Sequence, residues 1–338
     1  MNFRRPFAVL VLLTFLVAAL GAFVTCLQNS EISLSHILRG GLHGVCMGLP
    51  GLFIAIFIFP YIKPWRRRLP LILDVLFFSG FYFLLILAGR GFAFWVTGAR
   101  EFALLGRDEN FAGAVVIALM LTIFGNFILK LSRIIGRNEL FNFFVGRYRR
   151  PQLEHRMIMF LDLKGSTTIT ERIGDLKYLR LLDQFFLRMT PALRASGGSI
   201  HKYIGDEAII TWPHRATAAT GLEFVRQFRQ RIDQDAPFFE QRFGLQPRFR
   251  ASLHYGEILI GEVGDIKKEI AYLGDALNTA ARLIDFGKTT GYPVTVSESV
   301  PGISEWSAKT DLGSHQLKGK EGSLRLYGVK QFQETPTP

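Results

Sequence analysis

Four long apolar stretches in the first 130 residues restrict the fold of this 338-residue chain more than any other feature. A transmembrane α-helix needs roughly 20 consecutive, mostly apolar residues, and each stretch comes close to that length. A cleaved signal peptide could account only for the first stretch, which lacks a polar tail with a small-residue cleavage site. We therefore expect residues 1–130 to form an all-α membrane domain of four transmembrane helices, over 7–27, 41–62, 71–89 and 112–129.

The basic residues beside these stretches predict the orientation of the helices, because cytoplasmic loops are enriched in Lys and Arg. Basic residues without acidic neighbours precede the first stretch, fill the loop at 63–68 and follow the fourth stretch. The two remaining loops are poorer in basic residues or mix them with acidic ones. We expect a multi-pass protein of the cell (inner) membrane with its N- and C-termini in the cytoplasm.

The formal net charge of +12 fits that arrangement, since much of the excess borders the bilayer, where anionic headgroups attract it. The charge is therefore no indication of a nucleic-acid partner. Both cysteines, Cys26 and Cys46, lie in or beside the apolar stretches, which leaves 150–338 without a disulfide or a thiolate zinc site. His43 and Asp74 lie near the starts of two stretches, where we expect water to reach them. We interpret the membrane domain as an anchor, with a relay or ligand site at these two residues as the alternative.

A basic connector over 131–152 joins the last apolar stretch to the rest of the chain. Its apolar residues recur at roughly helical spacing, and basic residues fill the gaps. Two interpretations remain open. The connector is either a juxtamembrane helix lying on the headgroups, or a short helix that pairs with its copy in a dimer and passes a signal onward.

Residues 153–335 are typical of a separate α+β domain, because short β-like runs alternate with amphipathic helical ones. A tight turn at Gly205 and Asp206 joins two of the runs as a hairpin. The expected architecture is a mostly antiparallel sheet covered by helices.

Two of the β-like runs, "MIMFLD" and "KYIGD", end on a carboxylate, Asp162 in the first and Asp206 in the second. If the strands are neighbours, both carboxylates emerge at the same edge of the sheet, where they would repel each other. A divalent cation would relieve this repulsion, and oxygen ligands without nearby His or Cys favour Mg²⁺ or Mn²⁺. The alternative is that the two residues are an ordinary turn residue and a helix cap.

The segment "LKGSTT" that follows Asp162 predicts a phosphate site, because a glycine and hydroxyl residues open a helix there and free backbone N–H groups bind phosphate. The candidate residues are Lys164, Gly165, Ser166 and Thr167.

A third motif, "GDALNTAARL", places Asn278 and Arg282 at i and i+4, on one helix face. An asparagine can hold a sugar oxygen, and an arginine can stabilise the negative charge that develops on a phosphate. Alone, the pair would more often be a solvated helix face. Together with the two aspartates and the phosphate segment, in this order, it indicates a nucleoside-triphosphate site.

With these motifs, residues 155–330 resemble the class III nucleotidyl cyclases, the catalytic domain of adenylyl and guanylyl cyclases. The resemblance covers over half of the chain and rests on "FLDLKGST", "KYIGDE" and "GDALNTAARL". It implies a ferredoxin-like, palm-type fold and head-to-tail homodimers with active sites at the interface.

The resemblance also implies roles for individual residues. Asp162 and Asp206 match the two metal-binding aspartates, with the backbone carbonyl of Leu163 as a further ligand, for two Mg²⁺ or Mn²⁺ ions per active site. Asn278 and Arg282 match the pair that stabilises the transition state. In the dimer, one protomer would supply the aspartates and the other would supply this pair.

Other matches concern the base and the phosphates. Lys202 matches the lysine that reads adenine, on the same protomer as the transition-state pair. Lys318 in "LKGKEG" matches the lysine that grips the terminal phosphates, with Lys320 as the neighbouring candidate, and Arg250 is a further candidate to face the phosphates. The second base-reading position, usually Asp or Thr in adenylyl cyclases, falls on Ala271, which has no side-chain acceptor for the adenine amino group.

The resemblance thus implies a membrane-anchored adenylate cyclase whose partners are ATP, a second copy of the chain and the lipid bilayer. The ribose 3′-oxygen of ATP would attack the α-phosphorus in line, releasing pyrophosphate and 3′,5′-cyclic AMP. Lys202 argues against guanine, whereas Ala271 leaves a guanylate or relaxed-specificity cyclase as an alternative. "YIGDEAII" also resembles the hairpin of diguanylate cyclases, but the doubled glycine of that family is missing. A non-catalytic, nucleotide-binding membrane receptor is the last alternative, although no expected aspartate or arginine is lost.

Overall fold

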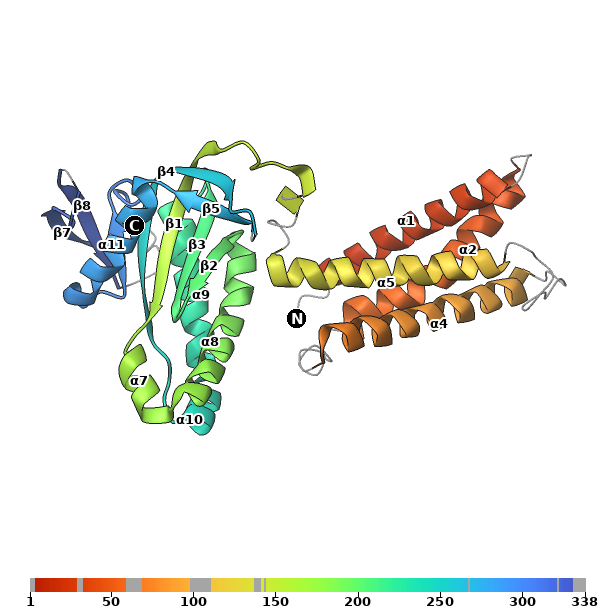
Figure 1. Ribbon diagram of the computed structural model, residues 1–338, viewed down its shortest axis with the longest axis horizontal. Coiled ribbons are helices and arrows are strands. Elements are labelled where there is room, and N and C mark those ends of the chain that lie inside the picture. The colour runs from red at the N-terminus through yellow and green to blue at the C-terminus, as the bar shows by residue number, and fades with distance from the viewer. Residues whose placement is uncertain are drawn as a thin grey trace. The chain divides into compact units, whose positions relative to one another are not determined.

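The computed structural model of the chain comprises two compact units, Met1–Leu140 and Phe141–Pro338 (Figure 1). It describes residues 4–28, 33–58, 69–97, 111–136, 141–142, 144–266, 268–320 and 322–330. Some expectations lie outside the described residues. They concern the basic loop at 63–68, the mixed loop at 98–110, part of the connector and the end of the expected 153–335 domain.

The described part of the first unit consists of long helices that coincide with the four apolar stretches. Two segments, Gly40–Ile58 and Leu71–Ala93, are long and apolar enough to cross a membrane, whereas the apolar helical segment Leu10–Phe23 is shorter. Length and composition therefore support two possible crossings, and the four-helix membrane domain stays a prediction. The helices are α1 (Arg4–Gln28), α2 (Leu34–Phe53) with its π-helical extension η1 (Ile54–Ile58), α4 (Leu71–Thr97) and α5 (Phe111–Ile135).

Glycines allow three of these helices to pack closely. A Cβ atom on Gly21 of α1 would lie 2.3 Å from the carbonyl oxygen of Gly40 in α2. A Cβ atom on Gly89 of α4 would lie 2.2 Å from the carbonyl oxygen of Cys46 in α2. Any side chain at these positions would force the helices apart, so small residues determine this packing.

An ion pair joins α4 to α5. The Nζ atom of Lys130 lies 2.9 Å from Oδ2 of Asp74, and the Asp74 side chain is only 1% exposed. Beside it, the Asn126 amide donates a hydrogen bond of 3.1 Å to the Ser79 hydroxyl. The expectation that water reaches Asp74 is therefore wrong, because α5 places a lysine directly against it.

Removing one member of this pair should destabilise the first unit more than removing both. Asp74→Ala leaves the Lys130 ammonium without its carboxylate, a change that costs about 3 kcal/mol or more in buried pairs. The double variant Asp74→Ala/Lys130→Met should recover most of that loss. Thermal unfolding of the full chain in detergent would measure both effects, and a double variant no more stable than the single one would contradict the expectation.

The second unit is built on an eight-stranded sheet in the order β2-β3-β1-β4-β6-β8-β7, with β5 paired to the end of β4. Every pairing is antiparallel except that of β4 with β6. The first four strands and their helices follow the β-α-β-β-α-β succession of ferredoxin-like folds, which agrees with the expected palm-type α+β domain. The strands are β1 (Gln152–Leu163), β2 (Ser199–Ile204), β3 (Glu207–Pro213), β4 (Phe249–Val263), β5 (Glu269–Leu273), β6 (Val294–Ser297), β7 (Lys309–His315) and β8 (Leu324–Val329).

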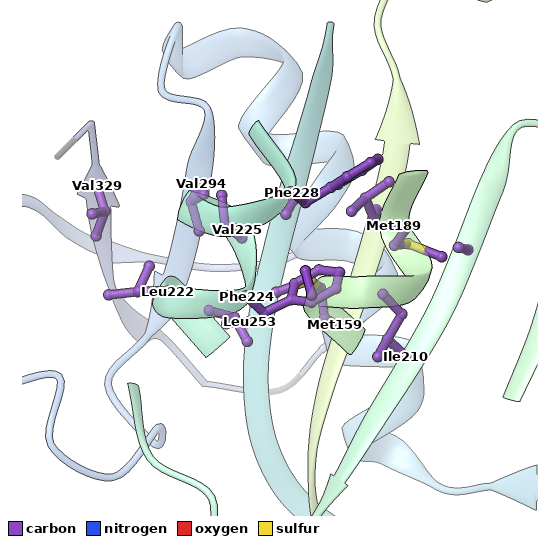
Figure 2. Close-up of a cluster of buried hydrophobic side chains, with 14 of the residues drawn as sticks. Met159, Met189, Ile210, Leu222, Phe224, Val225, Phe228, Leu253, Val294 and Val329 are labelled. Atoms are coloured by element: carbon purple, nitrogen blue, oxygen red, sulfur yellow. The ribbon is translucent and has the colours of Figure 1, made fainter. Parts of the chain in front are cut away.

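Helices cover both faces of this sheet, which explains why the centre of β1 is a continuous apolar run and not an alternating one. Met157, Met159 and Leu161 point into a core on the side of α8 and α9, whereas Ile158 and Phe160 point into a second core on the side of α11. Figure 2 shows the first core, to which β1, β3, β4, α8 and α9 contribute Met159, Ile210, Leu253, Met189 and Phe224. The helices of this unit are α7 (Ser166–Ile173), α8 (Asp175–Ser196), α9 (Ala218–Gln234), α10 (Ala236–Phe243) and α11 (Asp275–Thr290).

The end of the connector belongs to the second unit. Residues 144–145 are helical, a turn with Gly146 at φ 65° follows, and β1 begins at Gln152. Tyr148 is 2% exposed and packs in the core on the side of α11. Neither a helix on headgroups nor a helix paired with its copy describes these last connector residues.

Candidate active site

The register of the sheet brings the two predicted carboxylates together. Asp162, near the end of β1, lies opposite Glu207, the first residue of β3. Asp206 lies in the turn directly before Glu207. Burial, the negative charge of Asp206 and a side-chain hydrogen bond with Asp206 all raise the pKa of Asp162. The two carboxylates are therefore close enough to interact, and both are partly buried.

Positive charges partly compensate the carboxylates. Arg250 lies opposite Asp162 on the other neighbour, β4, with its Nε atom 3.3 Å from Oδ2 of Asp162. Arg250 and Lys288 of α11 oppose the rise in the pKa of Asp162. Burial and the charge of Asp162 raise the pKa of Glu207 to about 7. Negative charge is therefore in excess around Asp162, Asp206 and Glu207, because Lys288 is already paired with Asp285, and this excess favours binding of further positive charge.

The segment after β1 forms the predicted helix start. Gly165 adopts φ 73°, a left-handed conformation that disfavours other residues, and α7 begins at Ser166 without a side-chain cap. The first N–H groups of a helix have no partner within the helix, so Ser166 and Thr167 can present theirs to an anion. The Lys164 amide cannot, because it donates to the Arg248 carbonyl at 2.8 Å.

The Lys164 side chain nevertheless lies in a basic environment. Burial and the charges of Arg250, Arg229 and Arg248 lower the pKa of Lys164. A triphosphate bound at this loop would relieve the repulsion between these cations.

The predicted base-reading residues lie on β2 and β5. The Nζ atom of Lys202 is 3.6 Å from Oε1 of Glu269, and both side chains are about half exposed. Ala271 lies two residues after Glu269, and alternate residues of a strand share one face. The structure therefore places a carboxylate beside Lys202 that the sequence motifs did not identify.

The third motif forms α11, and the "LKGKEG" loop lies against it. Arg282 donates to the Gly319 carbonyl at 3.2 Å. Lys320 lies 2.9 Å from Asp275 Oδ2 and donates to the Thr279 hydroxyl at 2.9 Å, and this lysine lowers the pKa of Asp275. Asn278 precedes Arg282 by one helical turn.

This loop separates the roles of its two lysines. Lys320 is held by α11, whereas Lys318 is exposed. Of the two candidates for the terminal phosphates, Lys318 is therefore the more accessible one, whereas Lys320 holds the loop against α11.

The second unit is similar in sequence and fold to known proteins. A family model described as the adenylate and guanylate cyclase catalytic domain matches residues 149–331. The chain belongs to this family.

Adenylate cyclase 2 of Rhizobium meliloti (strain 1021) is 38% identical to this chain over 210 residues, 60% of this chain and 57% of that protein. An adenylate cyclase of Anabaena cylindrica is 28% identical over 182 residues, 51% of this chain and 36% of that protein. The structure of a bacterial light-regulated adenylyl cyclase matches with a TM-score of 0.54 at 20% identity, over 69% of this chain and 68% of that one, which shows a common fold. The chain thus spans between about a third and three fifths of the two relatives' own length.

Two residues near the candidate site had no recognisable sequence signal. The charge of Lys288 on α11 acts on Asp162, yet in sequence Lys288 looks like an ordinary surface pair with Asp285, to which it donates at 2.6 Å. Tyr178 of α8 lies near the same carboxylates, and burial together with the charge of Asp206 raises its pKa to about 12. Both residues come from helices whose position depends on tertiary packing.

The two loop lysines should respond differently to substitution. Lys320→Ala should lower the melting temperature of the full chain by a few degrees, because it removes contacts with Asp275 and Thr279 worth about 1 kcal/mol. Lys318→Ala is the matched control and should leave the melting temperature unchanged. Equal shifts for both variants would contradict this assignment.

Proposed function

We propose that this chain is a membrane-anchored adenylate cyclase that converts ATP to 3′,5′-cyclic AMP and pyrophosphate. The observation that carries the proposal is the partly buried pair Asp162 and Asp206 beside a helix start lined with basic residues, in a chain of the cyclase family. Carboxylates next to a phosphate-binding loop are the arrangement that a nucleoside triphosphate with its metal ions requires.

The residues present fit divalent cations. Oδ2 of Asp206 is buried and has no hydrogen-bond partner, which suits a metal ligand. No group of three or more His, Cys, Asp or Glu side chains with metal-ligand geometry occurs within the described part of the chain. With two carboxylates available, Asp162, Asp206 and the Leu163 carbonyl would hold two Mg²⁺ or Mn²⁺ ions, and the triphosphate would complete the coordination. Such ions would lower the pKa of the ribose 3′-hydroxyl and neutralise charge on the phosphates.

The chain's own residues would bind and orient the nucleotide. The amides of Ser166 and Thr167, together with Lys164 and Lys318, would hold the phosphates. Asn278 would hold the ribose, and Arg282 would stabilise the negative charge that grows at the α-phosphorus. The 3′-oxygen forms a bond to the α-phosphorus as the bond to pyrophosphate breaks, so catalysis rests on positioning and charge.

A homodimer would complete this site. In a single chain, Arg282 contacts Gly319, whereas the charges acting on Asp162 are those of Asp206, Arg250 and Lys288. The transition-state pair would therefore act on the carboxylates of the partner subunit, with two equivalent sites related by the dimer axis. Exposed apolar residues on β2, β4 and β5 support burial against a second copy: Tyr203, Ile204, Val263 and Leu273.

Adenine is the base that we propose, with Lys202 as the residue that reads it. Glu269 lies beside Lys202 and two residues before Ala271 on β5. A carboxylate is therefore available near position 271, where the alanine side chain cannot accept a hydrogen bond from the adenine amino group. Ala271 also favours a second candidate, a cyclase with relaxed specificity that accepts GTP.

We propose that the first unit anchors the enzyme in the inner membrane as a multi-pass domain with both termini in the cytoplasm. The two apolar helical segments, Gly40–Ile58 and Leu71–Ala93, support membrane association. The basic flanks of the apolar stretches support the orientation.

Product analysis tests the proposal directly. The purified full chain, offered ATP and GTP in parallel with Mn²⁺, should release mainly cyclic AMP. Asp206→Asn should lower the rate at least about a hundredfold, because it weakens a charged metal ligand. Full activity of this variant would refute the metal assignment, and an equal rate with GTP would favour the relaxed-specificity enzyme.

Complementation tests the shared site. Asp162→Ala and Arg282→Ala should each be nearly inactive alone, because each dimer then lacks a required group in both sites. When the two variants are coexpressed, mixed dimers contain one intact site, so part of the activity should return. If coexpression restores nothing while both variants fold and dimerise, each site is built from one chain.

A further inference from the structure

A partly buried arginine in the first half of β1, Arg156, lies outside the site residues described so far. The Arg156 side chain is 15% exposed and donates twice to the Glu154 carboxylate, at 2.9 Å from Nε and 2.7 Å from Nη2. This carboxylate already balances its charge. The remaining contacts of the guanidinium are with the turn before β1, with β3 and with β5.

One of these contacts is with the segment that enters the second unit. Nη2 of Arg156 donates to the Tyr148 hydroxyl at 3.2 Å, and that hydroxyl donates to Glu154 at 3.0 Å. The Tyr148 carbonyl in turn accepts a hydrogen bond of 3.0 Å from the Glu262 amide of β4. The position of Tyr148 is therefore tied to β1 and β4, just after the chain leaves the first unit.

A second contact of the Arg156 guanidinium is with β5. Nη1 of Arg156 donates to the Tyr272 hydroxyl at 3.4 Å, and the guanidinium carbon lies 5.5 Å from the centre of the Tyr272 ring. Tyr272 directly follows Ala271, the second base-reading position. The same Nη1 also donates to the Thr211 hydroxyl of β3 at 3.4 Å.

Tyr272 continues the connection to β2. Its ring stacks on His201 with ring centres 3.8 Å apart and an interplanar angle of 9°. The β2–β3 pairing shifts register between Ile200 and Lys202, so His201 is the residue at the bulge. Burial lowers the pKa of His201 to about 4, so the ring is neutral at pH 7 and does not repel the nearby guanidinium.

The contacts therefore form one continuous path. It runs from Tyr148 through Arg156 to Tyr272 and His201, whose chain neighbours are Ala271 and Lys202. We propose that Arg156 is a positioning residue for the nucleotide base: it fixes β5 and the β2 bulge so that Lys202 and position 271 face the base correctly. Through Tyr148, the segment that follows the membrane unit then acts on base recognition and not on the reacting phosphorus. This inference rests on the proposed cyclase function.

The path predicts which kinetic constant changes. A displaced base pocket weakens nucleotide binding and discrimination, whereas the carboxylates and Arg282 remain in place. Substitutions along the path should therefore raise KM and reduce selectivity for ATP over GTP, with little change in kcat. A residue with a merely structural role would lower the amount of active enzyme and leave KM and selectivity unchanged.

Arg188 offers a matched control in the same unit. Its side chain is 12% exposed, its Nε atom pairs with Asp235 at 3.0 Å, and its guanidinium lies over the Phe238 ring at 4.3 Å. It is as buried and as well paired as Arg156, but its partners belong to α8, α10 and the residue between α9 and α10. Arg188→Lys should cause a comparable loss of stability without touching the base pocket.

The experiment compares Arg156→Lys, Tyr148→Phe and Arg188→Lys in the full chain in detergent, with kcat and KM measured for ATP and for GTP. Arg156→Lys should raise KM for ATP about fivefold, the size expected for the loss of one typical hydrogen bond, and lower the ATP preference, with kcat within about twofold. Tyr148→Phe removes only a hydroxyl and should act in the same direction to a smaller extent. Arg188→Lys should leave KM and the ATP preference unchanged.

The possible outcomes are distinguishable. An active wild type whose Arg156→Lys and Tyr148→Phe variants keep the wild-type KM and ATP preference overturns the inference and leaves the proposed function intact. If Arg156→Lys does not fold, Tyr148→Phe decides by the same criterion. A folded wild type that releases no cyclic nucleotide overturns the proposed function, and the inference falls with it.

Discussion

The register of β1 between β3 and β4 is the constraint on which the proposed site depends. Residues directly opposite each other in a sheet lie on the same face, and β1 places Asp162 opposite Glu207 on one side and Arg250 on the other. A slip by one residue would turn Asp162 toward the opposite face and remove it from this row. Such a slip would also exchange every side chain from Met157 to Leu161 between the two cores, and the close packing of protein cores resists that exchange.

The same strand face also connects the two ends of the proposed site. Arg156, Ile158, Phe160 and Asp162 share one face, because alternate residues of a strand point the same way. The two apolar residues lie under α11 in the second core, so Arg156 and Asp162 are held on one rigid support. Rigid elements position catalytic groups better than loops do. The helix that covers this face, α11, carries Asn278 and Arg282.

The elements that carry the candidate site could be predicted from sequence, because each of its motifs is local. A β-like run that ends on an aspartate, a Gly-Asp turn and an i, i+4 pair on a helix are all visible within ten residues. The long helices of the first unit were equally evident from their apolar stretches. The number of membrane crossings was not evident, since within the described residues length and composition support Gly40–Ile58 and Leu71–Ala93 alone.

The residues that could not be predicted depend on contacts between distant segments. Asp74 pairs with Lys130 only because α4 and α5 pack together. Glu269 pairs with Lys202 only because β5 pairs antiparallel with β4. The stacking of His201 on Tyr272 requires a bulge in β2, and no feature of a single sequence marks that position. Such contacts are set by tertiary register, which local patterns do not contain.

If two strand ends converge to bind divalent cations with a nucleotide, the number of bound Mn²⁺ ions tests this most directly. Electron paramagnetic resonance would count these ions on the full chain in detergent with a non-hydrolysable ATP analogue. We expect two Mn²⁺ ions per bound nucleotide for the wild type and fewer than one for the Asp162→Asn/Asp206→Asn variant. An unchanged Mn²⁺ count in a folded double variant would contradict it.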